Sequence, residues 1–439
     1  MSAVSGRLRS EYFGMYPNVY YSASALHAVH SSPALDITFA SLRVMVCALL
    51  RSQRTLPKPR PSGTYESTID VFFALAILFV MREQVAEYLK NVTISSRKQL
   101  FDALNFIAPL IDVWSLAAPK SGQQFLRFSS AKSRTTGYVD FTIPKKTGGV
   151  RKISAPVKPL KEVQSAINTL LQLIFIPDEH ATGFVLGKSV KDNALIHVGQ
   201  TCIFNTDLEN FFPSITKKMV RRALHTELGH ILNSNDVINT ICRLCTVPNS
   251  DGIEVLPQGA PTSPILSNIV LAGLDRDMAK LADRMECKYS RYADDITLSH
   301  SKPVLKMSSY LQSKIHRIIL KYGLKVNEIK TKTYVPGRRQ EVTGVVVSSK
   351  INVARTYVKN LRILLHLWEK YGYIQAQLIF IRDFCHGKEK NLENVIDGKI
   401  NYLEMIKGKD DSTYLKFKRR LKLLQYKERQ KTTYTKRAI

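Results

Sequence analysis

Cysteine, acidic side chains and long apolar stretches are all scarce in this sequence of 439 residues. The six cysteines stand mostly among apolar residues, which argues for a reducing cytoplasm and against a disulfide framework. Cys242 and Cys245 have C-x-x-C spacing, but no second Cys or His pair stands nearby to complete a zinc site. We therefore expect a buried helix at this position.

No membrane segment is expected. The apolar run at residues 71–81 is eleven residues long, whereas a membrane span needs about twenty. Near the start of the chain, Arg7 and Arg9 are followed by Glu11 and several tyrosines instead of an apolar run, so no signal peptide is expected either. We predict a cytoplasmic protein without a membrane partner.

Basic residues outnumber acidic ones by a wide margin. There are 64 Lys and Arg against 36 Asp and Glu, a net charge of +28. The cations are spread along the chain and not gathered on one amphipathic helix, which favours nucleic acid over a membrane surface. At residues 416–439 cations alternate with aromatic rings, a pattern that suits phosphate contacts and base stacking. A merely solubilising tail is the alternative.

Three aspartates stand at predicted strand ends. Apolar residues alternate on both sides of Asp294 and Asp295, which predicts a strand-turn-strand tip, and Asp207 follows a second apolar strand. An Asp pair at a turn can simply hydrogen-bond its own backbone. Three such carboxylates, however, supply the oxygen ligands that hold two Mg²⁺ ions roughly 3.5–4 Å apart.

At these residues the chain resembles a reverse transcriptase. Residues 292–295 look like the catalytic tetrad of that family, and Asp207 with the two phenylalanines at 211 and 212 looks like its first metal-binding motif. The resemblance implies that Asp207 and Asp294 ligate both ions while Asp295 supports the site electrostatically. It also implies nucleotide contacts from the tetrad's Tyr292.

The same resemblance assigns the pocket for the incoming nucleotide. Phe212 would press against the ribose 2′ carbon and select deoxynucleotides. Residues 141–156 read as a hairpin with Gly-Gly at the turn, and the resemblance implies that Arg151 with Lys145 or Lys146 grips the triphosphate. A solvated basic hairpin is the alternative.

Two further positions match family motifs. Gln258 and Gly259, within residues 256–264, resemble the loop that enters a helix beneath the templating pair, where glycine allows close backbone approach. Lys330 matches the position proposed to protonate the leaving pyrophosphate, and an ordinary surface lysine is the alternative.

A narrower resemblance is to bacterial retron enzymes. Asn193 and His197 fit an Asn-Ala-x-x-His signature, although four-residue spacing also describes two core residues on one helical face. Val342, Thr343 and Gly344 resemble the Val-Thr-Gly motif of these enzymes. The resemblance implies that all five residues bind the enzyme's own structured RNA.

The resemblance covers roughly residues 140–425 and implies an α+β fold, a right-hand polymerase with a helical thumb. The predicted parts are an N-terminal helical region of unknown role (1–125), fingers (126–200), a palm with an inserted fingers segment (201–347), a helical thumb (348–425) and a basic tail (426–439).

The implied function is that of a retron-type RNA-directed DNA polymerase. Its partners would be deoxynucleotide triphosphates, a noncoding RNA that is both template and primer, the complementary DNA product and an effector or toxin protein. The product would be RNA-linked single-stranded DNA, made in defence against phage. The alternatives are a defence reverse transcriptase without a 2′-branched product and a non-catalytic RNA-binding protein.

Overall fold

The computed structural model describes residues 85–107, 137–145, 148–302, 308–335, 337–385 and 388–437, with side chains up to residue 430. The chain divides into two compact units, Met1–Asp70 and Val71–Ile439, and all described residues belong to the second. Of the predicted N-terminal helical region, residues 85–90 and α5 (Arg97–Ile107) are helical, while residues 1–84 and 108–125 lie outside the described ones. None of the described helices has the length and apolar character that crossing a membrane requires.

A four-stranded antiparallel sheet carries the predicted site. Its strands lie in the order β6 (Lys288–Tyr292), β7 (Asp295–His300), β3 (Cys202–Asp207) and β8 (Lys332–Tyr334). All residues of β7 except the first are buried. Burial along a whole strand means that both faces of the sheet are covered.

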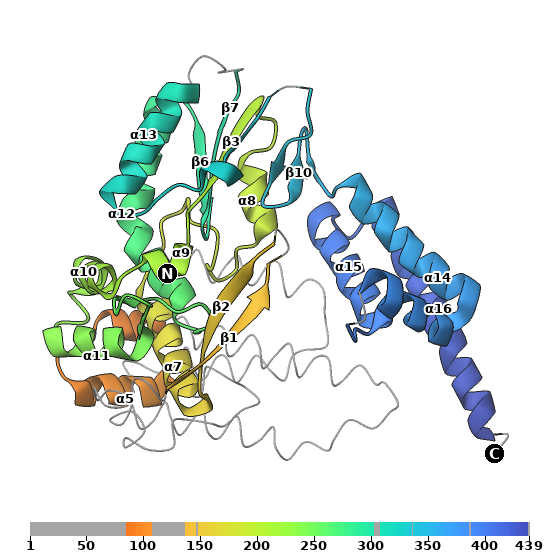
Figure 1. Cartoon of the computed structure of the whole chain (residues 1–439), viewed down its shortest axis with the longest axis horizontal. Helices are drawn as coiled ribbons and strands as arrows, with labels where there is room; N and C mark the ends of the chain where they lie inside the picture. Colours follow the sequence, from red (N-terminus) through yellow and green to blue (C-terminus); the bar gives the residue numbers. More distant parts are fainter. Residues whose placement is uncertain are drawn as a thin grey trace, which may run out of the picture. The chain divides into compact units, whose positions relative to one another are not determined.

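Helices cover the two faces of this sheet (Figure 1). Side chains alternate along β6, so Tyr289 and Arg291 reach α12 (Ser263–Arg284), whereas Ser290 reaches His197 at the end of α8 (Val190–Ile196). On the outer side of α12 lies α13 (Ser308–Lys321).

A helical layer continues below the sheet. α5 packs on α7 (Lys158–Ile174) and α11 (Asn235–Cys245), and α10 (Lys217–Leu228) packs on α11 and α12. Short elements connect these helices: α9 (Phe211–Ser214) and the pair β4 (Val247–Pro248) and β5 (Glu254–Val255). Cys242 and Cys245 are completely buried in α11, which confirms the buried-helix prediction. This burial raises the pKa of both thiols to about 12.

The predicted basic hairpin is present. β1 (Tyr138–Pro144) pairs with β2 (Val150–Pro156) along its whole length. The turn contains Gly148 and Gly149 with φ of +89° and +77°, a backbone conformation that favours glycine. Residues 146–147 lie outside the described ones.

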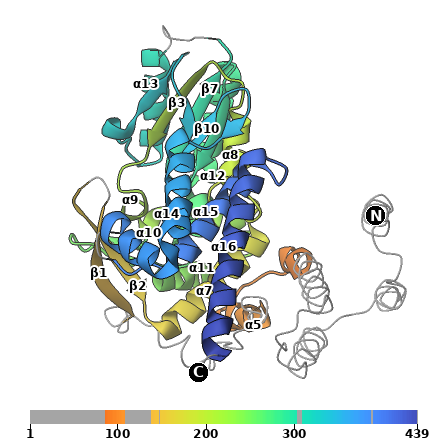
Figure 2. The ribbon, with the colours of Figure 1, turned by 90° about the vertical axis from the view of Figure 1, so that its right-hand side faces the viewer.

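The C-terminal part combines a small sheet with long helices (Figure 2). The sheet has the order β11 (Ile351–Asn352), β10 (Val345–Val347), β9 (Glu341–Val342). The helices are α14 (Arg355–Ile379), which breaks at Gly372, the π-helix η5 (Phe380–Phe384), α15 (Leu392–Lys407) and α16 (Ser412–Arg437). Their buried apolar side chains, Trp368 among them, belong to one core that also includes residues of the small sheet.

The predicted boundary between thumb and tail at residue 425 is wrong, because it falls inside α16. Residues 412–437 contain no Gly or Pro, and their many Lys and Arg are good helix formers. The basic tail is therefore a continuation of the last helix.

Candidate active site

Three aspartates meet at one edge of the central sheet. Asp207 ends β3 and Asp295 begins β7, and the antiparallel register pairs their Cα atoms. Asp294 lies in the two-residue turn between β6 and β7, across which Tyr292 pairs with Asp295. The backbone N–H of Leu208 donates to the Asp294 carbonyl at 3.1 Å. The structure therefore confirms the predicted tip and brings the three carboxylates together.

The turn that carries Asp294 has an unusual backbone. Ala293 has φ of +59°, a conformation that normally favours glycine at the first central residue of a tight hairpin. Gly183 lies directly against it, because a Cβ built on Gly183 would stand 2.2 Å from the Ala293 nitrogen. On the other side, Arg291 Nη1 donates to the Ala293 carbonyl at 3.0 Å. The position of Asp294 is thus set by packed neighbours.

A buried polar network supports this turn, and the sequence prediction missed it. Arg291 donates to both carboxylate oxygens of Asp275 in α12, at 2.7 and 2.6 Å. Arg291 also donates to Asn268 at 3.1 Å, whose own amide donates to the Gly183 carbonyl at 2.9 Å. Tyr289 completes the network through Asp275. One feature of the sequence could have indicated this network: Asn268 and Asp275, seven residues apart, interrupt an apolar helix face.

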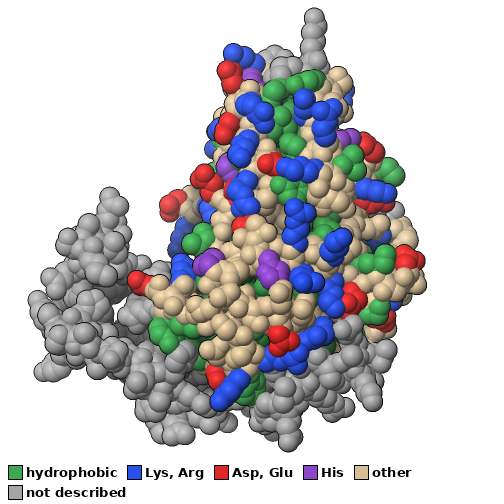
Figure 3. Space-filling model, turned by 90° about the vertical axis from the view of Figure 1, so that its left-hand side faces the viewer, with side chains coloured by type: hydrophobic (Ala, Val, Ile, Leu, Met, Phe, Trp, Pro, Cys, Tyr) green, Lys and Arg blue, Asp and Glu red, His purple; other side chains and the backbone are tan. Residues whose placement is uncertain are grey.

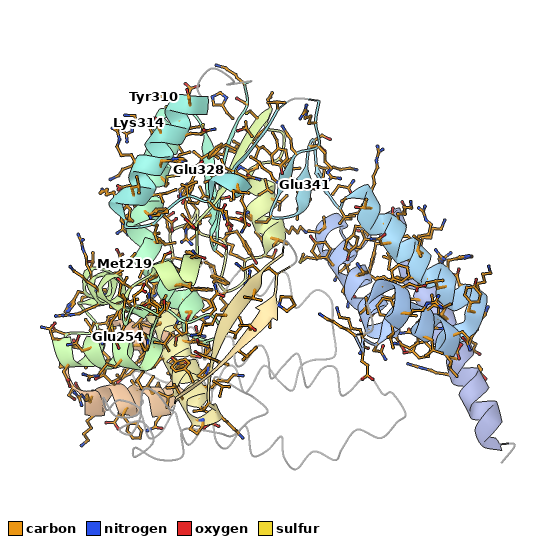
Figure 4. All side chains as sticks on the ribbon, in the orientation of Figure 1. Met219, Glu254, Tyr310, Lys314, Glu328 and Glu341 are labelled. Atoms are coloured by element: carbon orange, nitrogen blue, oxygen red, sulfur yellow. The ribbon has the colours of Figure 1, made fainter. Side chains whose placement is uncertain are left out.

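Lys330 contacts one of these three carboxylates. Its Nζ lies 2.7 Å from Asp207 Oδ2. The short helix η4 (Glu328–Lys330), whose first residue is labelled in Figure 4, is fixed by Asn327, which donates its backbone N–H to the Asp207 carbonyl at 2.7 Å. The hydrogen bond to Asp207 raises the pKa of Lys330, so this ammonium stays protonated at neutral pH. Its role as an acid stays a prediction.

Burial and mutual repulsion disfavour the charged form of two of the three carboxylates. Burial, followed by the charge of Asp207, raises the pKa of Asp294 to about 6. Asp295 is exposed as a whole residue, yet loss of hydration at its carboxylate and the charges of Asp294 and Asp207 raise its pKa to about 7. Like charges this close disfavour one another's ionisation, and a bound cation would remove that cost. The edge is therefore a cation-binding candidate.

Aromatic rings follow Asp207 along the chain. Phe212, half-buried in α9, has its ring centroid 6.0 Å from that of Phe184 at an interplanar angle of 28°. The ring of Phe211 is 5.1 Å away on the same short helix. Phe212 thus has a packed position close in sequence to a catalytic candidate, and its contact with a ribose stays a prediction.

The predicted triphosphate and template contacts lie on and beside the hairpin. Lys145 and Arg151 are exposed near its turn, and Lys146 lies outside the described residues. Gly259 has φ of +124°, and an added Cβ would stand 3.1 Å from the Ser154 carbonyl of β2. The Ser154 N–H donates to the Gln258 carbonyl at 2.8 Å. The close approach expected of this glycine is therefore to the hairpin, and the nucleotide contacts stay predictions.

Comparison with known proteins identifies the family. Residues 143–363, half of the chain, match the family model described as "Reverse transcriptase (RNA-dependent DNA polymerase)". The chain is 35% identical to the Retron Ec86 reverse transcriptase of Escherichia coli over 266 residues, covering 59% of this chain and 73% of the relative. The chain belongs to the retron-type reverse transcriptases.

Other relatives agree. This reverse transcriptase is 36% identical over 248 residues to the Retron Mx65 reverse transcriptase of Myxococcus xanthus, covering 54% of this chain. The match spans 57% of the length of that relative, and the same share of the Retron Mx162 reverse transcriptase. Among solved structures, a telomerase from Candida albicans aligns with a TM-score of 0.37 and 12% identity over 65% of this chain and 63% of that chain, a likeness too low to support an inference.

A reverse transcriptase fold implies a divalent metal cofactor, and Asp207, Asp294 and Asp295 fit one chemically. Hard divalent cations prefer carboxylate oxygens, and a cation here would relieve the repulsion that raises the pKa of Asp294 and Asp295. Across the described residues, no three His, Cys, Asp or Glu side chains already stand in a metal-binding arrangement. These carboxylates would therefore have to reorient on binding.

Asn193 and His197 of this reverse transcriptase lie in the core. His197 is completely buried, and its ring nitrogens pair with Ser290 at 2.8 Å and Ser299 at 2.7 Å on the back of the sheet. Burial lowers its pKa to about 3, so the ring is neutral. Asn193, also completely buried, accepts a hydrogen bond from Thr182 at 2.8 Å. The alternative of a hydrogen-bonded core pair describes these two residues.

The predicted RNA contacts are corrected accordingly. Asn193, His197 and Val342 are completely buried and have no surface with which to touch RNA, because β6 and the sheet of β9 to β11 pack against one side of α8. Thr343 and Gly344 do reach the surface, in a two-residue turn with φ of +47° and +79°. Asn193 donates to the Thr343 hydroxyl at 3.4 Å. Asn193 therefore supports this turn from inside.

Proposed function

We propose that this protein is an RNA-directed DNA polymerase that works with two Mg²⁺ ions. The observation that carries the proposal is the meeting of Asp207, Asp294 and Asp295 at one sheet edge in a chain of the reverse transcriptase family. Nucleotidyl transfer depends on positioning and on charge stabilisation more than on covalent catalysis. A rigid edge with excess negative charge meets both needs.

Each residue at the edge would have a separate task. Bound ions would activate the attacking hydroxyl and neutralise the leaving pyrophosphate. Asp207 and Asp294 would hold them, and Asp295 would add negative charge beside them. Lys330 would give its proton to the pyrophosphate, for which its protonated state beside Asp207 is suited.

The incoming nucleotide would be bound from two sides. Arg151, with Lys145 or Lys146, would hold its triphosphate from the hairpin, whose turn end is exposed. Phe212 would stand against the ribose and exclude a 2′-hydroxyl. Gln258 and Gly259 would lie beneath the templating base, next to the hairpin.

The template would be a dedicated structured RNA that also acts as primer through a 2′-hydroxyl. Three features support an RNA partner: the net charge of +28, the exposed turn at Thr343 and Gly344, and relatives named as retron reverse transcriptases. Figure 3 shows many Lys and Arg side chains and fewer acidic ones on the described part of one face. The product would be RNA-linked single-stranded DNA, made in the cytoplasm for antiphage defence with an effector protein.

Purification from the native host, followed by sequencing of bound nucleic acid, tests the proposal. We expect a discrete RNA-linked DNA whose 5′ end a debranching enzyme releases. Asp294→Asn should abolish this DNA and lower primer extension at least about 100-fold. The matched control is Asp277→Asn, because Asp277 pairs with Lys321 on the surface of α12. Unbranched DNA would indicate another kind of reverse transcriptase, and RNA without DNA a binding protein.

A further inference from the structure

Residues 181–184 lie alongside the end of β6 and next to the Ala293–Asp294 turn, which is the catalytic turn of the proposed function, and hydrogen bonds fix their backbone. The backbone N–H of Thr182 donates to the Arg291 carbonyl at 2.8 Å, and Ala181 forms a parallel bridge with the same residue. The Gly183 carbonyl accepts from Asn268 at 2.9 Å. The next residue, Phe184, is therefore presented from a rigid support at the predicted site.

Phe184 has a backbone conformation that bulky residues rarely adopt. Its φ is +60°, and its side chain remains 37% exposed. A strained φ in a large residue persists only where the surroundings determine it, and such residues gather at functional sites. The conformation directs the Phe184 ring onto Phe212.

Phe212 consequently has two aromatic neighbours. Phe184 stacks on it with 6.0 Å between centroids, and Phe211 contacts it at 5.1 Å with a tilt of 40°. Phe211 is buried, with only 6% of its surface exposed, and its ring is therefore held by the core. Aromatic pairs at these separations attract each other in defined orientations, so the two neighbours restrict the rotation of the Phe212 ring.

We propose that Phe184 is a positioning residue for nucleotide selection. Its ring holds Phe212 in the orientation that blocks a ribose 2′-hydroxyl, and the site therefore takes deoxynucleoside triphosphates in preference to ribonucleoside triphosphates. The inference rests on the proposed polymerase function and on the assignment of Phe212 to the ribose. Without the ring at position 184, Phe212 turns aside more readily and admits the 2′-hydroxyl.

The test is the ratio of kcat/KM for one deoxynucleotide to that for the matching ribonucleotide, on an RNA template with a DNA primer. Phe184→Ala and Phe184→Gly should lower this ratio about three- to tenfold, mainly through a lower KM for the ribonucleotide. Phe184→Tyr keeps the ring and should keep the ratio. Phe184→Gly tolerates the positive φ, so a loss of selectivity there does not come from backbone strain.

The controls separate the possible outcomes. Leu186→Ala alters a neighbouring side chain that is 63% exposed and should leave the ratio unchanged, whereas Phe212→Ala should lower it most. A wild-type protein that adds no deoxynucleotide contradicts the proposed function. A wild-type protein that selects deoxynucleotides, with unchanged selection in Phe184→Ala and Phe184→Gly, overturns the role of Phe184 alone.

Discussion

Arg291 in β6 and Asp275 in α12 form a doubly hydrogen-bonded ion pair from which solvent is excluded, with side chains 0% and 1% exposed. Arg291 stands three residues before Asp294 in the chain and also donates to the carbonyl of Ala293. If one member of the pair is removed, water cannot reach the remaining buried charge and take the place of its partner. The pair therefore links the stability of the fold to the geometry of the catalytic turn.

Asp275→Asn should lower the free energy of unfolding by about 3–5 kcal/mol, because it leaves the Arg291 charge buried without its partner. Denaturant unfolding at pH 7 measures this. The matched control is Asp236→Asn, which breaks the exposed pair with Arg97 and should cost at most about 1 kcal/mol. Equal losses of unfolding free energy in the two variants would show that the buried Asp275 pair contributes no more stability than the exposed pair.

The charge of the metal-free site should make stability fall as pH rises. The folded-state pKa of Asp294 is raised to about 6 and that of Asp295 to about 7, above the ordinary value of 3.8. The folded protein therefore binds more protons than the unfolded chain between about pH 4 and pH 7. The stability that these protonated groups provide is present below pH 4 and is lost by pH 8.

Asp295→Asn should remove much of this loss. In EDTA the variant should differ little from wild type at pH 4.5 and be more stable by about 1 kcal/mol at pH 8, once screening at the exposed edge is allowed for. Thermal unfolding at both pH values measures the difference. Adding Mg²⁺ should stabilise wild type more than the variant, and a variant less stable than wild type at pH 8 would contradict the charge argument.

Features with local signals were predictable from the sequence. The hairpin around Gly148 and Gly149, the strands on both sides of the Asp294 turn and the buried helix at Cys242 all show in periodicity and turn residues. Each depends on neighbours only a few positions away. Their structures match the predictions.

Features made by distant contacts were not predictable. Four-residue spacing puts Asn193 and His197 on one helical face, but it does not show what covers that face. Thr343, the partner of Asn193, is 150 residues away in the chain. The same limit hid the partner of Arg291, and with it the support of the catalytic turn. Burial arises from tertiary pairing, so a surface role inferred from a motif was wrong for side chains that the fold encloses.

Gly183→Ala tests whether close packing positions the catalytic turn. The added Cβ would stand 2.2 Å from the Ala293 nitrogen and 2.7 Å from the Tyr292 carbonyl carbon, so the turn must move. A displacement of about 1 Å at a catalytic group costs about 100-fold in rate, which primer extension would detect. Gly398→Ala in α15 meets no atom within 4 Å and should keep full activity. Normal activity of Gly183→Ala would mean that the turn tolerates displacement.

Variants of Lys330 distinguish a role as proton donor from a role that needs only its positive charge. Lys330→Arg keeps the cation beside Asp207 but cannot release a proton, whereas Lys330→Met removes both. If Lys330 is the acid for pyrophosphate, both variants should slow single-turnover addition about 100-fold or more. Lys332→Met, an exposed lysine of β8, is the matched control and should keep the wild-type rate. A fast Lys330→Arg with a slow Lys330→Met would instead assign Lys330 an electrostatic role, in which its positive charge alone stabilises the leaving group.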